Sequence, residues 1–148
     1  LLEKKGFRLE DYAFYHPGGN LGRQLLKIED IMRKGARNPI VREDALVKET
    51  LLATTHARAG AAVIVDADGR LAGIFTDGDL RRSLEKDPDL LSKRVKDYMT
   101  RSPLAISADK LVAEAMRLIK SERKKDLPVV DADGKPIGFV DEQDLLGL

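Results

Sequence analysis

The sequence contains no cysteine and no tryptophan, and aromatic residues make up only 5% of its 148 positions. Without cysteine the chain can form neither a disulfide framework nor a thiolate-ligated metal centre. Only 2 histidines are present, so we expect no metal site. No apolar stretch approaches the roughly 20 residues needed to cross a bilayer, and no signal peptide is visible. We therefore expect a cytoplasmic protein that does not enter a membrane.

Neither sign of charge is in excess, because 26 basic side chains face 25 acidic ones and the formal net charge is +1. Proteins that bind nucleic acid usually carry a clear basic excess on one face, so we expect no nucleic-acid partner. The 43% hydrophobic and 34% charged residues are typical of a globular chain of one domain or two small ones. The chain begins with Leu1 and Leu2, which indicates a piece of a longer protein.

An internal repeat is the main feature of the sequence. Asp-Ala-Asp-Gly at 66–69 returns at 131–134, which is 65 residues later. Upstream, Asp-Ile-Met at 30–32 corresponds to Asp-Tyr-Met at 97–99, an offset of 67 that leaves a loop two residues longer in the first copy. A match of this length, made twice, indicates two structurally equivalent units.

Each copy has the same order of predicted elements. An extended piece precedes an amphipathic helix, and two strands joined by the Asp-Gly turn follow, at 62–65 and 71–75 in the first copy and at 127–130 and 136–140 in the second. A unit of about 55 residues is marginal alone, so we expect the copies to cover each other. The prediction is an α/β (α+β) fold of two β-α-β-β-α repeats packed face to face with pseudo-two-fold symmetry. We expect a tail and linker at 1–27, repeats at 28–84 and 95–148, and a linker at 85–94.

Polar side chains follow the second strand of each copy. Thr76 and Asp79 have the spacing of a capping box, in which a side chain at each end satisfies a free backbone amide at the start of a helix. The same residues could instead line a cleft and hold a polar ligand, because a carboxylate can accept both hydroxyls of a ribose. In the second copy Asp141 and Asp144 keep the capping spacing without the hydroxyl, and two close carboxylates would disfavour an anionic ligand.

Residues 28–148 resemble a tandem pair of CBS domains. The resemblance rests on the Asp-Ile-Met and Asp-Tyr-Met openings, the Val-Asp-Ala-Asp-Gly hairpins and the stretch Gly-Ile-Phe-Thr-Asp-Gly-Asp-Leu that ends at Leu80. It implies that Thr76 and Asp79 contact the ribose of an adenosine-type nucleotide between the copies. In the second copy it implies this role only for Asp144, because Asp141 stands where the family has Thr or Ser.

Several basic residues could hold the phosphate of such a ligand. Arg81 follows the Thr-x-x-Asp pair closely, and Lys125 precedes a strand that should border the second half of the cleft. The run 121–126 can also be read as a helix end, where the helix dipole favours cations. Four further residues lie in loops that could face a cleft, and the sequence does not choose among them: Arg33, Lys34, Arg37 and Arg101.

The stretch His-Pro-Gly-Gly-Asn-Leu-Gly-Arg-Gln-Leu-Leu at 16–26, followed by Asp-Ile-Met, is similar to the junction in arabinose-5-phosphate isomerases. These bacterial enzymes interconvert arabinose 5-phosphate and ribulose 5-phosphate for lipopolysaccharide biosynthesis. The resemblance implies that His16 is a catalytic residue in the full-length enzyme, where imidazole would transfer protons near neutral pH. The remaining catalytic groups would lie upstream, so we expect this chain to be inactive alone.

The expected function is therefore regulatory ligand binding and subunit assembly. The ligand would be an adenine nucleotide such as AMP or ATP, or a CMP-activated sugar, with no cofactor required. We expect a homodimer here and a tetramer for the full-length enzyme. One alternative is a structural oligomerisation scaffold without a ligand, in which Thr76 and Asp79 only cap a helix. Another is that residues 1–27 complete an active site in a partner chain.

Overall fold

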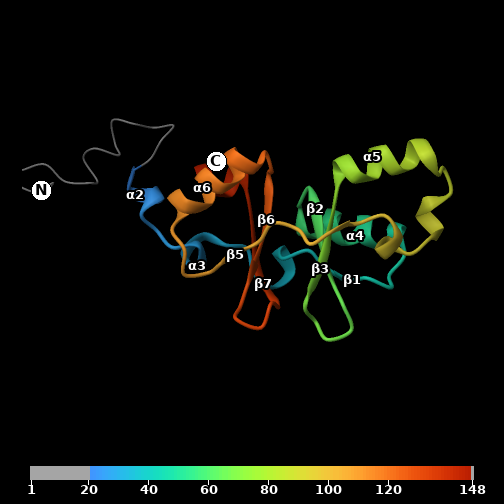
Figure 1. Ribbon diagram of the computed structural model, residues 1–148, viewed down its shortest axis with the longest axis horizontal. Helices are drawn as coiled ribbons and strands as arrows, with labels where there is room; N and C mark the ends of the chain where they lie inside the picture. Colours follow the sequence, from blue (N-terminus) through green and yellow to red (C-terminus); the bar gives the residue numbers. More distant parts are fainter. Residues whose placement is uncertain (1–20, 148) are drawn as a thin grey trace, which may run out of the picture.

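The computed structural model describes residues 21–147, which form two lobes, each built on a small sheet (Figure 1). The first lobe consists of strands β1 (Ile40–Arg42), β2 (Ala61–Val65), β3 (Leu71–Thr76) and β4 (Thr100–Arg101) with helices α4 (Val47–Ala57) and α5 (Asp77–Lys86). The second consists of β5 (Ile106–Ser107), β6 (Asp126–Val130) and β7 (Pro136–Asp141) with α6 (Val112–Glu122) and α7 (Glu142–Leu146). Short helices α2 (Leu21–Gln24) and α3 (Ile28–Ile31) and the 3-10 turns η2 (Gly35–Arg37), η3 (Leu90–Ser92) and η4 (Val95–Asp97) complete the described chain.

The two lobes share one topology. β1 runs parallel to β2, and β2 pairs antiparallel with β3, as β5, β6 and β7 do in the second lobe. The hairpins turn at Gly69 and Gly134, whose φ angles of 82° and 81° favour glycine. In both turns the first aspartate accepts backbone hydrogen bonds, at 2.9 and 3.0 Å to Asp66. The predicted β-α-β-β-α repeat and α/β fold are confirmed.

The helices follow the predicted pattern of apolar residues. On α6 the side chains of Val112, Ala115 and Ile119 are buried against the second sheet. α5 ends at Lys86, directly before Asp87 and Pro88, because proline disfavours a helical conformation in the residue before it.

Each lobe is completed by a segment from the beginning of the other copy. We call residues 27–33 the N-terminal arm and residues 94–100 the central arm. Ile28, in α3, is fully buried in the core of the second lobe, and its amide donates to Lys110 at 2.8 Å. Val95 is fully buried in the core of the first lobe, and its amide donates to Ala45 at 2.8 Å. Figure 1 shows α3 beside the second lobe, so the lobes exchange arms.

Two glycines let the arms lie close against the sheets. A Cβ atom on Gly73 would lie 2.6 Å from Sδ of Met99 and 2.7 Å from the carbonyl oxygen of Thr100. At the equivalent Gly138 it would lie 2.8 Å from Cγ of Met32. Both distances are shorter than van der Waals contact, so the repeated glycine is needed for arm packing rather than for a turn.

The lobes also meet through a small apolar cluster between the sheets. Its buried members are Ala61, Val63, Ile74 and Phe139. Ile74 and Phe139 occupy equivalent positions 65 residues apart, so each sheet contributes the same strand position to the contact between the lobes. This arrangement confirms the predicted face-to-face packing with pseudo-two-fold symmetry.

Candidate functional site

A cleft of about 860 Å³ lies between the lobes, where the last strand of each hairpin ends. Residues of both lobes line it, including Thr76 and Asp79 from the start of α5 and Asp141 from the start of α7. Ile74, Pro103 and Leu104 are the apolar members of the lining. The cleft therefore combines a polar edge at two helix starts with a small apolar surface.

In the first lobe Thr76 and Asp79 form the capping box that their spacing predicts. The Asp79 amide donates to Oγ1 of Thr76 at 3.1 Å, and the Thr76 amide donates to Oδ2 of Asp79 at 2.9 Å. Asp79 is only 8% exposed, so its carboxylate needs these donors. The capping interpretation is confirmed, and it leaves the ligand interpretation open because both side chains also line the cleft.

Two further side chains contact Asp79. Nη2 of Arg82 lies 2.7 Å from Oδ1, and Oγ1 of Thr100 donates at 3.2 Å from the central arm. The Arg82 side chain is 70% exposed. Because Arg82 is largely exposed, a ligand hydroxyl could take its place while Asp79 keeps the hydrogen bonds from the Thr76 amide and Thr100.

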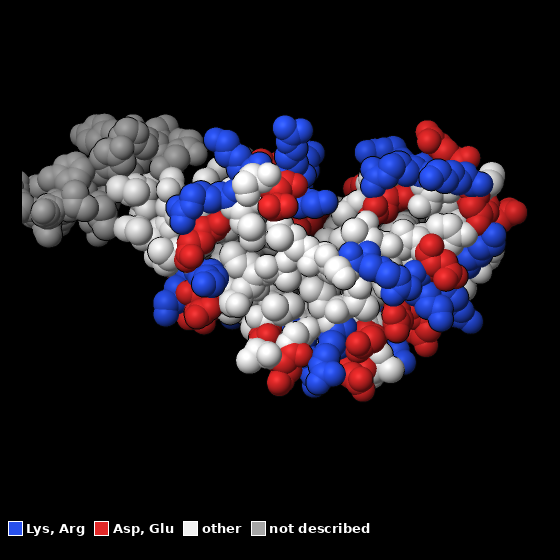
Figure 2. Space-filling view, viewed as in Figure 1, with Lys and Arg blue, Asp and Glu red and all other residues white. Residues whose placement is uncertain are grey.

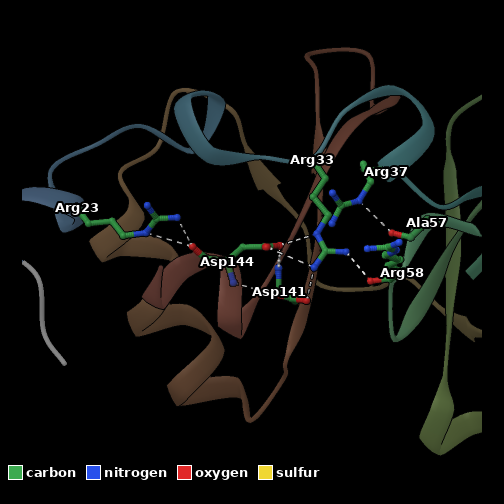
Figure 3. A network of polar contacts seen from close by, with 7 residues as sticks. All are labelled: Arg23, Arg33, Arg37, Ala57, Arg58, Asp141 and Asp144. Carbon is green, nitrogen blue, oxygen red and sulfur yellow. Dashed lines mark hydrogen bonds and ion pairs between the residues drawn. The ribbon is translucent and has the colours of Figure 1, made fainter. Parts of the chain in front are cut away.

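In the second lobe the equivalent carboxylates are bound to Arg33 (Figure 3). Its Nε lies 2.9 Å from Oδ2 of Asp144, and its Nη2 lies 2.8 Å from Oδ2 of Asp141. The two aspartates also cap α7 reciprocally, at 2.8 and 2.9 Å. Burial raises the pKa of Asp141, and the nearby Asp144 carboxylate raises it further while Arg33 opposes the shift. The sequence predicted two close carboxylates that cap a helix here, and the structure adds Arg33 as the cation that pairs with both.

Arg33 also connects the two lobes. Its Nη1 donates to the carbonyl oxygen of Arg58 at 2.9 Å, just after the end of α4. Its guanidinium carbon lies 5.7 Å from the centre of the Phe139 ring. Nearby, Arg37 donates to the carbonyl oxygen of Ala57 at 3.3 Å, so Arg37 binds the end of α4 (Figure 3). Of the four loop residues that the sequence left open, Arg33 is the one in the cleft lining.

Basic side chains stand on both walls of the cleft. Arg81 and Arg82 extend from α5, and Arg123, Lys124 and Lys125 follow α6. Figure 2 shows blue side chains on both lobes beside the notch that separates them at the upper edge of this face. Within residues 21–147, Arg81 and Lys125 form no ion pair or side-chain hydrogen bond, and both are exposed. The walls can therefore attract an anion.

Asp126 is the one strongly perturbed carboxylate in the lining. It is paired in register with Asp141 across β6 and β7. Burial, together with the nearby Asp141 and Asp77 carboxylates, raises the pKa of Asp126 to about 6. The folded protein therefore holds a proton on Asp126 at pH values where the unfolded chain, with a pKa of about 3.9, has lost it.

The free energy of unfolding should consequently fall as pH rises from about 4 to about 6, since the folded state binds more protons than the unfolded state. Asp126→Asn removes the ionised group and should raise the free energy of unfolding by about 1–2 kcal/mol above pH 7, after allowance for partial exposure. The gain should vanish near pH 4. Urea unfolding at both pH values measures it. Asp133→Asn, in an exposed turn, is the control, and an equal gain at both pH values would contradict the assignment.

The remaining site predictions concern histidines and metals. His16 lies outside the described residues. His56, which corresponds to Ser121 at the repeat offset of 65, is exposed on α4. In residues 21–147 no group of three or more histidine, aspartate or glutamate side chains is placed to hold a metal ion. Over the same residues no helix is long and apolar enough to span a bilayer.

A comparison with protein families matches the CBS domain model to residues 28–86 and 95–148. The chain belongs to the CBS domain family. The CBS pair is also similar to CBSX2 of Arabidopsis thaliana, whose crystal structure was solved in complex with AMP. That likeness has a TM-score of 0.69 and 28% sequence identity, and it covers 82% of this chain and 93% of the other.

Curated relatives extend over the whole chain, including the stretch before the CBS pair. The arabinose 5-phosphate isomerase KdsD of Pseudomonas aeruginosa is 43% identical over 147 residues, which is 99% of this chain. KdsD of Yersinia pestis is 42% identical over 147 residues. This chain spans only 45% and 44% of the length of these two relatives. The resemblance to the isomerases is confirmed for the part of their length that this chain covers.

Sequence reasoning missed the contacts that Arg33 and Thr100 make with the paired carboxylates. A signal was present, because each residue directly follows the repeated methionine, at Met32 and Met99. The offset of 67 therefore predicts equivalent places for them. The offset does not predict that each arm contacts the opposite lobe, so the contact between Arg33 and Asp144 could not be predicted from the sequence.

Proposed function

We propose that this chain is the regulatory nucleotide-binding and assembly module of a sugar-phosphate isomerase that interconverts arabinose 5-phosphate and ribulose 5-phosphate. The observation that carries the ligand-binding part is the cleft at Thr76 and Asp79, with basic walls on both lobes. The isomerase part rests on the 43% identity to KdsD of Pseudomonas aeruginosa across 147 residues. In the full-length enzyme His16 would act as a catalytic residue, and this chain alone would be inactive.

Each residue of the site has a proposed role. The Asp79 carboxylate and the Thr76 hydroxyl bind the ribose hydroxyls, with the carboxylate accepting hydrogen bonds in place of Arg82. Arg81 and Lys125 stand on opposite walls and bind the phosphate. CBSX2 binds AMP, which supports an adenine nucleotide; a CMP-activated sugar has the same ribose and phosphate chemistry. Asp144 belongs to the equivalent place in the second lobe. No cofactor is required.

The regulatory part rests on the position of α7. Its first turn faces the cleft through Asp141, and its last carbonyl groups accept hydrogen bonds from Arg23 of α2 (Figure 3). The distances from Nε of Arg23 to the carbonyl oxygens of Asp144 and Leu145 are 3.2 and 3.3 Å. A ligand that moves α7 would act on α2 and so on the junction that precedes it. The proposed mechanism is a ligand-dependent bias between two arrangements.

The assembly part is a homodimer of this chain and a tetramer of the full-length enzyme. The rival function is a scaffold without a ligand, in which Thr76 and Asp79 serve only as a helix cap. Its support is that both carboxylate oxygens of Asp79 already accept hydrogen bonds.

A thermal-shift panel with AMP, ADP, ATP, CMP and a CMP-activated sugar tests the ligand. A compound at 100 times its dissociation constant should add about 2.7 kcal/mol to the free energy of unfolding. Thr76→Val and Asp79→Ala should abolish the ligand-induced shift, measured against each variant's own ligand-free melting temperature because loss of the cap alone costs about 1 kcal/mol. Asp68→Ala, an exposed carboxylate of the hairpin turn, should keep the full shift. A flat panel at millimolar ligand would favour the scaffold.

A further inference from the structure

We propose that Arg33 is an internal cation that closes the second half of the cleft, so that each chain binds one nucleotide, in the half around Thr76 and Asp79. The inference rests on the proposed nucleotide-binding function and adds its stoichiometry and the residue that determines it. The two halves are related by the repeat, and a pair of equivalent sites would be the expectation from symmetry alone. The contacts of Arg33 break that symmetry.

Arg33 and Thr100 are equivalent residues in the two arms. Thr100 lies opposite Ile74 in the β3–β4 pairing, and Arg33 pairs with Phe139, with backbone hydrogen bonds of 2.8 and 3.1 Å. Each arm thereby brings its side chain to the capping box of the opposite lobe. The first half of the cleft receives a neutral hydroxyl, and the second half receives a guanidinium group.

Every carboxylate oxygen of the second capping box already accepts a hydrogen bond. Oδ2 of Asp144 accepts from Nε of Arg33 at 2.9 Å, and Oδ1 accepts from Nη2 at 3.3 Å. Oδ2 of Asp141 accepts from the same nitrogen at 2.8 Å, and its Oδ1 accepts from the Asp144 amide. The ribose hydroxyls of a second nucleotide would have to compete with the Arg33 guanidinium for these oxygens.

The two halves also differ in how easily the bound arginine can leave. The Arg33 side chain is 11% exposed, against 70% for Arg82 in the first half. Arg33 is held in addition by the carbonyl oxygen of Arg58 and by the Phe139 ring. Displacing it would leave two mostly buried carboxylates without their cation, which neutral hydroxyl groups cannot replace and an anionic phosphate would oppose. Displacing the exposed Arg82 leaves Asp79 with the hydrogen bonds from the Thr76 amide and the Thr100 hydroxyl.

Isothermal titration of the 148-residue chain with AMP, and separately with CMP, tests the inference. Arg33→Thr combined with Asp141→Thr gives the second half the threonines and single carboxylate of the first. This double variant should bind two ligands per chain, and the parent chain one. Adding Asp79→Ala should remove the first site from each, through a loss of about tenfold or more in affinity. Arg33→Lys keeps a cation in place and should still bind one.

The outcomes separate the inference from the proposed function. Two ligands on the parent chain, or one ligand on both the parent and the double variant, would overturn the closure by Arg33 while nucleotide binding stands. No ligand on the parent chain but one on the double variant would reject the first-half site and support the closure. Absence of binding to every variant, with circular dichroism showing each one folded, would reject both.

Discussion

Phe139→Ala should lower the free energy of unfolding by about 3–5 kcal/mol, the range for removing a large buried aromatic side chain. Phe139 is fully buried in the cluster between the sheets, opposite Ile74 of the other lobe. It also provides the ring beneath Arg33, so the substitution leaves a cavity next to the ion pairs of the second capping box. A loss of this size is a large part of the 5–15 kcal/mol that stabilises a typical domain.

Urea unfolding measures the effect, and Ile137→Ala is the matched control. Ile137 lies two residues away on the same strand but is 38% exposed, so its truncation should cost about 1 kcal/mol or less. Equal losses in the two variants would show that the contact between the lobes contributes little. If Phe139→Ala lowers the free energy of unfolding and the two lobes then unfold in separate transitions, this contact is what couples their unfolding.

Ile28→Ala should cost about 2–5 kcal/mol, and the loss should fall on the second lobe. Ile28 begins the first copy in sequence, yet it is fully buried in the second lobe among residues such as Val112 and Leu145. Native-state hydrogen exchange at low urea concentration measures where protection is lost. The amides of β6 and β7 should exchange faster than those of β2 and β3.

Leu91→Ala is the control for loss of an apolar side chain from a connecting segment, because Leu91 is 41% exposed. Its effect should stay within about 0.5 kcal/mol. The assignment of Ile28 to the second lobe would be contradicted if Ile28→Ala increased amide hydrogen exchange mainly in the strands of the first lobe. It would also be contradicted if the loss of unfolding free energy were as small as that of Leu91→Ala.

Much of the fold could be predicted from the sequence because its signals are local. The alternation of apolar residues, the Asp-Gly turns and the capping spacing each act over a few residues, and each occurs twice. The observed strand β3 ends at Thr76, where the pattern placed the helix start. The capping box of Thr76 and Asp79 was predictable for the same reason, since both groups belong to one turn of backbone.

The partners of the two capping boxes were not predictable in this way. Thr100 and Asp79 are 21 residues apart, and Arg33 and Asp144 are 111 residues apart. No propensity or periodicity acts over such separations. From their spacing, Asp141 and Asp144 are only two close carboxylates. In the folded chain Arg33 supplies the cation that pairs with both.

The two-copy organisation, the elements of each copy and the helix caps follow from contacts within a few residues. Contacts between distant parts of the chain establish which lobe each arm completes, which arginine enters the cleft and how the two halves differ. These distant contacts form because a unit of about 55 residues cannot bury its sheet alone. Each copy therefore contributes an arm to the other lobe, with Ile28 buried in the second lobe and Val95 in the first. The same arms carry Arg33 to one half of the cleft and Thr100 to the other.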